Sequence, residues 1–219
     1  MSVPSGEDDA GVVPLEEALI INDLAERRRL MLSMLTEEPD AYLAQLQAAK
    51  LNDDVEVAHY AATAVVQISK ESDLKLQQLE RAFKTDPSAQ NLNEYCDFLG
   101  EYLGSGLAEG RVAQIQRQQY ARLLARRCER EDTLELRIRY ATALADVGQI
   151  DEAQAVTDQL VLDVPEEQEV WMLCLRLAVM RRDGDEVHRV IDAIDKQHVY
   201  LSAANREELA FWRNGEEAR

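Results

Sequence analysis

The side chains that most often carry metal or acid–base chemistry are few in this sequence and widely spaced. The 219 residues include three histidines and three cysteines, namely His59, His188, His198, Cys96, Cys128 and Cys174. No HExxH motif, no CxxC pair and no zinc-type spacing of cysteines and histidines accompanies them. We therefore expect no metal site. The cysteines are best interpreted as reduced thiols of a cytoplasmic protein.

Motifs for phosphate binding and nucleophilic catalysis are also missing. Neither GxGxxG nor GxxxxGK[ST] occurs, and GSGLAEG, residues 104–110, has no preceding strand, so we interpret it as a turn between helices. No GxSxG motif and no kinase signature is present. Acid–base catalysis needs a cleft and shifted pKa values, which abundant carboxylates alone do not predict. We expect no catalytic residue and no cofactor; an enzyme with a carboxylate site is the less favoured alternative.

Arginines form the most prominent charged cluster of an otherwise acidic chain. Arg122 and Arg126 are four residues apart on one expected helix, so their side chains lie next to each other. Pairing with the acid excess is one interpretation, and docking to an acidic partner or to membrane headgroups is another. Because 42 acidic residues face 24 basic ones, for a net charge of −18, we expect no nucleic-acid partner.

The composition predicts an all-α protein. Nine glycines and five prolines are few for a turn-rich β protein, and an apolar fraction of 46% is ordinary for a globular chain. No apolar run reaches the ~18 residues that a transmembrane helix needs. The N-terminus has no basic segment followed by an apolar one, so we expect neither a secretory signal nor direct membrane insertion.

Helical periodicity predicts three helical pairs joined by short glycine-containing turns, followed by a closing helix. The pairs are 91–103 with 111–127, 134–147 with 150–162, and 170–180 with 186–194, and the closing helix is 203–212. Residues 14–86 are expected to form an N-terminal helical region, with a break at Ser72 and Asp73. We expect a disordered acidic arm at 1–13 and a flexible tail at 214–219.

Residues 140–165, YATALADVGQIDEAQAVTDQLVLDVP, resemble a tetratricopeptide repeat. Gly148 stands where that family ends its first helix with a small residue. Glu152 and Ala153 correspond to its Glu-Ala pair, and Pro165 to its closing proline. The large, small and large positions of the first helix are filled by Tyr140, Ala141 and Leu144.

Arg137 and Thr157 depart from that pattern, because Trp and another aromatic residue are usual there. The intervals between Gly106, Gly148 and Gly184 are 42 and 36 residues, whereas the family repeats every ~34. For residues 87–213 the resemblance implies a right-handed α-solenoid, whose inner helices line a concave groove. An ordinary all-α bundle is the alternative.

The region before residue 87 follows another pattern. LNDDVEVAHYAATAVVQIS, residues 51–69, resembles a HEAT-type repeat, with an acidic start and an alanine-rich helix. Residues 14–32, 46–64 and 102–110 are together similar to helical-repeat proteins encoded beside Pel-type exopolysaccharide synthesis genes in Gram-positive bacteria. That resemblance implies a non-catalytic cytoplasmic scaffold. A membrane glycosyltransferase or transporter subunit would hold it at the inner face of the membrane.

The groove implied by the repeat register predicts the partner-binding residues. From the three pairs in turn, the lining would be Asn93, Cys96, Gly100 and Leu103; Glu135, Ile138, Thr142 and Ala145; and Glu169, Met172, Arg176 and Val179. We expect Ile138, Thr142, Met172, Arg176 and Val179 to bind an amphipathic partner helix. The alternative is that some of these residues are core in a shifted register. Self-assembly through the closing helix is the alternative function.

Overall fold

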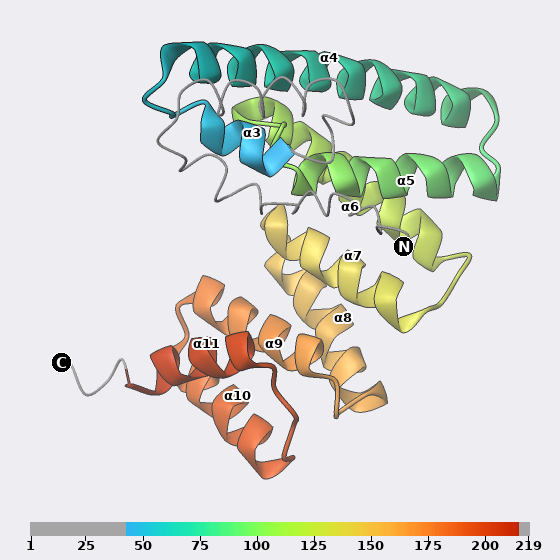
Figure 1. The fold of residues 1–219 in the computed structure, drawn as a ribbon. Coiled ribbons are helices and arrows are strands. Elements are labelled where there is room, and N and C mark those ends of the chain that lie inside the picture. The colour runs from blue at the N-terminus through green and yellow to red at the C-terminus, as the bar shows by residue number, and fades with distance from the viewer. Residues whose placement is uncertain (1–42, 215–219) are drawn as a thin grey trace, which may run out of the picture. The chain divides into compact units, whose positions relative to one another are not determined.

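The computed structural model describes residues 43–214, and every regular element in this range is an α-helix, which confirms the all-α prediction (Figure 1). The helices are α3 (Leu43–Ala49), α4 (Val55–Thr85), α5 (Ala89–Gly104), α6 (Gly110–Cys128), α7 (Leu134–Asp146), α8 (Ile150–Asp163), α9 (Gln168–Arg181), α10 (Gly184–Lys196) and α11 (Ala203–Asn214). The expected acidic arm, the helical segments predicted before residue 43 and the tail after Asn214 lie outside the described residues.

The chain divides between Gln78 and Leu79 into two compact units. This boundary falls inside α4, which is one continuous helix, so the predicted break at Ser72 and Asp73 is wrong. Neither residue removes a backbone donor as proline does, and each costs at most ~0.7 kcal/mol relative to alanine inside a helix. Helix α4 ends only at Thr85, just before Pro87.

Local side-chain bonds help to set where α4 begins. Leu46 and Ala49 are the buried residues of α3, the helix that precedes it. The side-chain oxygen of Asn52 accepts a hydrogen bond from the Asp54 amide at 3.0 Å, and Oδ1 of Asp54 accepts one from the Glu56 amide at 2.9 Å. These bonds satisfy backbone donors that the first helical turn would otherwise leave without partners.

The seven helices from α5 to α11 agree with the predicted pairs and closing helix to within a few residues at each end. Ser88, Thr133 and Asp183 cap α5, α7 and α10 through their side-chain oxygens. Gly148 follows α7 with φ +79°, a left-handed conformation that a residue with a Cβ adopts only with strain. The sequence therefore specifies these boundaries locally.

The core of the second unit forms where consecutive helices pack together, and α7 also contacts α9 directly. One cluster joins α7, α8 and α9 through small and large apolar side chains: Ala141, Leu144, Ala145, Ala153, Leu173 and Leu177. Ala153 is fully buried, so its small size lets α8 approach its neighbours closely. A second cluster packs α9, α10 and α11 around Trp171 and Leu175.

Candidate functional site

A cleft that contains several of the predicted partner-binding residues lies along α9, between α7 and α11. We call it the α9 groove. Its volume is about 510 Å³, and it is lined by Ile138, Thr142, Gln168, Glu169, Met172, Leu173, Arg176, Ser202, Asn205 and Glu208. Four of the five residues predicted from the repeat register, Ile138, Thr142, Met172 and Arg176, therefore come together in one cleft.

The α9 groove has an apolar floor and a polar rim of uneven charge. Ile138, Met172 and Leu173 supply the apolar lining. On the rim, Arg176 donates to Asp146 Oδ1 at 2.5 Å, so its charge is already paired. Glu169 and Glu208 are exposed and make no ion pair within residues 43–214. The net charge that the rim offers to a partner is negative.

The far wall of the α9 groove is fixed in place by Gln168. Its side-chain oxygen accepts hydrogen bonds from the Ser202 amide at 2.8 Å and from the Asn205 side-chain amide at 3.0 Å. These bonds tie the first turn of α11 to the first turn of α9. Gln168 is not among the residues predicted from the sequence, because its hydrogen-bond partners are 34 and 37 residues away.

Not every residue expected in a groove lies in one. Val179 is partly buried and packs against the core cluster of α9, α10 and α11, and it does not line the α9 groove. Cys96 and Ala145 are fully buried, so they belong to the core. Burial raises the pKa of the Cys96 thiol. The α9 groove thus gathers only part of the predicted lining, while Cys96, Ala145 and Val179 lie in the core or against it.

The arginines of α6 divide into two groups. Arg127, at the C-terminal end of the helix, is buried and donates to Asp97 Oδ1 at 2.6 Å. Arg126 is exposed, and its guanidinium lies 5.7 Å from the centroid of the Phe83 ring, within range of a cation–π contact. Arg122 is exposed and has no ion-pair partner within the described part of the chain.

Asp97 organises a polar cluster that no local sequence pattern predicts. Its Oδ1 also accepts from Arg139 Nη2 at 3.1 Å, so one carboxylate joins α5, α6 and α7. Nη2 and Nε of Arg139 donate to the hydroxyl of Tyr120, at 2.9 and 3.1 Å. A Cβ at Gly100 would lie 2.8 Å from that hydroxyl, so the missing side chain makes room for Tyr120. We call these residues the Asp97 cluster.

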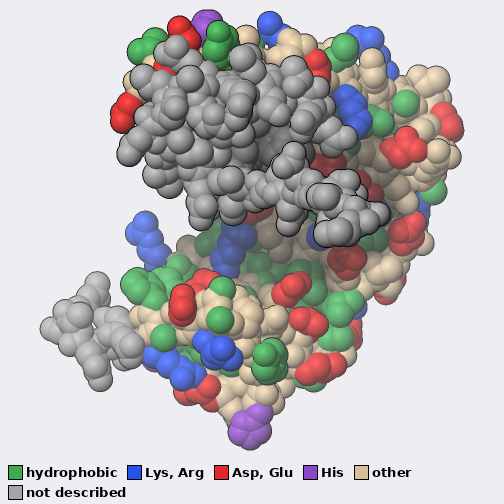
Figure 2. Space-filling model, viewed as in Figure 1, with side chains coloured by type: hydrophobic (Ala, Val, Ile, Leu, Met, Phe, Trp, Pro, Cys, Tyr) green, Lys and Arg blue, Asp and Glu red, His purple; other side chains and the backbone are tan. Residues whose placement is uncertain are grey.

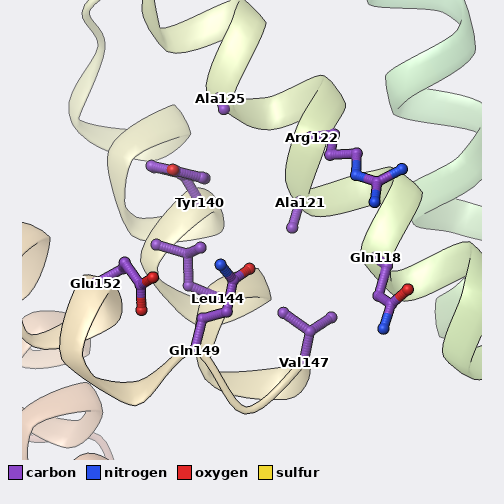
Figure 3. A pocket seen from close by; sticks show the side chains of 9 residues that line it. All are labelled: Gln118, Ala121, Arg122, Ala125, Tyr140, Leu144, Val147, Gln149 and Glu152. Atoms are coloured by element: carbon purple, nitrogen blue, oxygen red, sulfur yellow. The ribbon is translucent and has the colours of Figure 1, made fainter.

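A second cavity opens between α6, α7 and α8 (Figure 3). We call it the α6 cavity. Its volume is about 390 Å³, and it is lined by Gln118, Ala121, Arg122, Ala125, Tyr140, Leu144, Val147, Gln149 and Glu152. Ala121 and Leu144 give it an apolar floor. Figure 3 places Gln118 and Arg122 on the α6 wall, and Tyr140 and Glu152 on the opposite side.

The remaining chemistry of the described residues is sparse. Within residues 43–214, no group of three or more histidine, cysteine or carboxylate side chains is arranged to hold a metal ion. None of the helices in that range is long and apolar enough to cross a membrane. Figure 2 shows acidic and basic side chains interspersed over the described face that is turned to the viewer.

No family model, curated protein or solved structure matches the chain. The tetratricopeptide, HEAT and exopolysaccharide-scaffold resemblances therefore stay predictions from the sequence.

Proposed function

We propose that this protein is a non-catalytic protein–protein interaction scaffold whose α9 groove binds a basic amphipathic helix of a partner. The observation that carries the proposal is the convergence of Ile138, Met172 and Leu173 in one cleft under an acidic rim. An amphipathic helix binds by inserting apolar side chains into such a cleft. Basic residues beside those anchors would face Glu169 and Glu208, and this complementarity favours the correct partner.

The arrangement of the helices also supports this proposal. Stacked helical pairs present alternate helices on a common side, and here α7, α9 and α11 line the same cleft. Gln168 holds α11 against α9, so the groove is largely formed before a partner arrives. A preformed site reduces the entropy that is lost on binding.

The test uses fluorescein-labelled helical peptides and the full chain. One peptide carries leucine on one face and lysine on the other; a matched peptide carries glutamate in place of lysine. We expect the lysine peptide to bind more tightly, and Met172→Glu and Glu208→Lys to weaken that binding. Glu207→Lys is the matched control, because Glu207 is exposed on α11 but does not line the groove. Equal losses for Glu207→Lys and Glu208→Lys would contradict the proposal.

The exopolysaccharide version of the proposal names a membrane partner. It rests on the resemblance alone and predicts that a membrane glycosyltransferase or transporter subunit copurifies with the tagged protein from detergent-solubilised membranes. Copurification that persists in the Met172→Glu variant would place that partner outside the α9 groove. Recovery of only the tagged protein would remove the reason for this version.

Self-assembly is the second candidate, and one observation favours it. Leu209 is buried in the core cluster of α9 to α11, where Trp212 also packs, so α11 covers the end of that cluster. Phe211 and Tyr200, however, are 67% and 80% exposed. Exposed aromatic side chains are common at contacts between proteins. Concentration-dependent sedimentation that disappears in the Phe211→Ser variant would support self-assembly.

A further inference from the structure

Helix α6 is the basic element of an acidic chain. Its sequence, GRVAQIQRQQYARLLARRC, contains five arginines and no acidic residue, whereas the whole protein carries −18. Only Arg127 of these five makes an ion pair within residues 43–214. The arginines of the other helices in the second unit that do pair with carboxylates are Arg137, Arg139, Arg176, Arg181, Arg189 and Arg213. The exposed arginines of α6 thus differ from these, because they make no ion pair with a carboxylate of the described residues.

Two of these charges share one face of α6 with an exposed apolar residue. Arg111, Ile115, Gln118 and Arg122 follow one another at intervals of four, three and four residues, so they lie along one side of the helix. Ile115 is 54% exposed. Arg111 and Arg122 are about 16 Å apart along the axis, at about 1.5 Å per residue.

Helix stability does not explain Arg111. It lies in the first turn of α6, where the helix dipole disfavours a positive charge. It has no carboxylate partner in the described part of the chain to offset that effect. A residue that is electrostatically misplaced within its own helix, yet exposed, is available to an anionic group from outside.

The α6 cavity lies beside this face and shares Gln118 and Arg122 with it. Arg122 and Gln118 form one wall, and Ala121 and Leu144 form the floor (Figure 3). Burial raises the pKa of Tyr140 on the opposite side, and a tyrosine hydroxyl can donate a hydrogen bond. The cavity therefore combines a cation, a neutral donor and room for an apolar side chain.

We propose that the α6 face and the α6 cavity together bind an acidic peptide segment of a partner protein. Carboxylates of the segment pair with Arg111 and Arg122, and an apolar side chain between them enters the cavity above Leu144. This site is separate from the α9 groove, which offers negative charge, so a single chain can hold two partners of opposite charge. Glu152 stands at the far side of the cavity, so the acidic residues of the segment lie toward α6.

An acidic peptide fits this surface better than a membrane or a nucleic acid. An anionic bilayer or a phosphate backbone presents an extended negative surface, which would repel the rest of a chain that carries −18. A short peptide contacts only the α6 face and the α6 cavity, and charges beyond a Debye length of about 8 Å are largely screened. The apolar floor of the cavity also matches a side chain and has no counterpart in phosphate recognition.

The test measures the fluorescence anisotropy of three labelled 12-residue peptides with the full chain. The Glu/Leu peptide combines glutamate with leucine. The Glu/Ser peptide has serine in place of leucine, and the Lys/Leu peptide has lysine in place of glutamate. We expect the Glu/Leu peptide to bind, and its affinity to fall as salt rises. Arg122→Glu and Arg111→Glu should each weaken this binding at least tenfold. Arg182→Glu is the matched control, because Arg182 is exposed after α9, outside the α6 face, and the substitution makes the same charge change. It should stay within twofold of the parent protein.

Several results would overturn the proposal. Equal losses with Arg182→Glu and Arg122→Glu would mean that only the overall charge matters. Equal binding of the Glu/Ser and Glu/Leu peptides would mean that the cavity takes no apolar side chain. Stronger binding to phosphatidylserine vesicles than to the Glu/Leu peptide would assign the face to a membrane instead.

The melting temperature of Arg111→Glu should not fall, because a negative charge in the first turn is favourable to the helix dipole. A lower melting temperature would give Arg111 a structural role. Glu208→Lys in the α9 groove should leave binding of the Glu/Leu peptide unchanged. Weaker binding of that peptide would mean that the two sites are not separate.

Discussion

Replacing Asp97 with asparagine is the sharpest test of how the second unit is held together. The substitution keeps the shape of the side chain and one acceptor oxygen, but it removes the charge that Arg127 and Arg139 share. The Arg127 side chain is only 10% exposed, and its remaining acidic neighbour, Glu131, is 3.9 Å away. Two guanidinium groups would then face each other with their common carboxylate gone.

The size of the effect follows from how far each group is buried. Breaking a fully buried ion pair costs about 3–5 kcal/mol, and an exposed pair is worth about 0–1 kcal/mol. The Asp97 side chain is 47% exposed while Arg127 is nearly buried, so the cluster lies between these limits. We expect a loss of about 2 kcal/mol. For a protein of this size that lowers the melting temperature by about 4–8 °C.

Tryptophan fluorescence during urea unfolding measures this loss in the right unit, because both tryptophans, Trp171 and Trp212, lie after Leu79. Asp163→Asn is the matched control: its carboxylate pairs with Arg137 at 2.6 Å, but the Arg137 side chain is 21% exposed whereas that of Arg127 is 10% exposed, so we expect a smaller loss of stability. An Asp97→Asn loss no greater than that of the control would refute the argument that burial makes the Asp97 cluster a structural tie.

Three further predictions use the same unfolding assay or a chemical probe. Gly104→Ala should stabilise α5, because nothing lies within 4 Å of the added Cβ and alanine is more favourable than glycine in a helix by up to about 1 kcal/mol. Gly100→Ala should lose that gain, because its Cβ would displace the Tyr120 hydroxyl. Equal effects of the two substitutions would contradict this prediction. Ala153→Leu should cost about 1–3 kcal/mol through overpacking of a fully buried position, and an unchanged midpoint would argue against the close approach of α8. Cys128, the one thiol of the three with appreciable exposure, should react first with a thiol reagent in the folded protein, while burial raises the pKa of Cys174 to about 12 and protects it; simultaneous reaction of all three would be the contrary result.

Local sequence patterns predicted the helices from α5 onward because each boundary depends on residues close in the chain. Ser88, Thr133 and Asp183 act within three residues of their own positions, and Gly148 acts at the turn where it stands. The prediction of a break at Ser72 and Asp73 was wrong because these residues do not end a helix by themselves. Neither residue is a strong helix breaker, so the rest of α4 decides its length.

The candidate sites were harder to predict, because they depend on which helix faces which. Ile138, Thr142, Met172 and Arg176 were predicted together from the repeat register, and the structure places all four in the α9 groove. Arg127 lies on the same helix as Arg122, yet the structure buries Arg127 against Asp97, which is 30 residues away. No local pattern encodes that separation.

The distribution of ion pairs also bears on what the α6 arginines do. Arg176, Arg181 and Arg137 each bond a carboxylate on a neighbouring helix or turn, at 2.5, 2.8 and 2.6 Å. Such exposed pairs contribute little to stability individually, about 0–1 kcal/mol each. Charge reversal at Arg111 or Arg122, where no pair exists within the described residues, should therefore cost even less. Because the fold does not depend on these two charges, a loss of peptide binding in the reversed variants would report on docking rather than on folding.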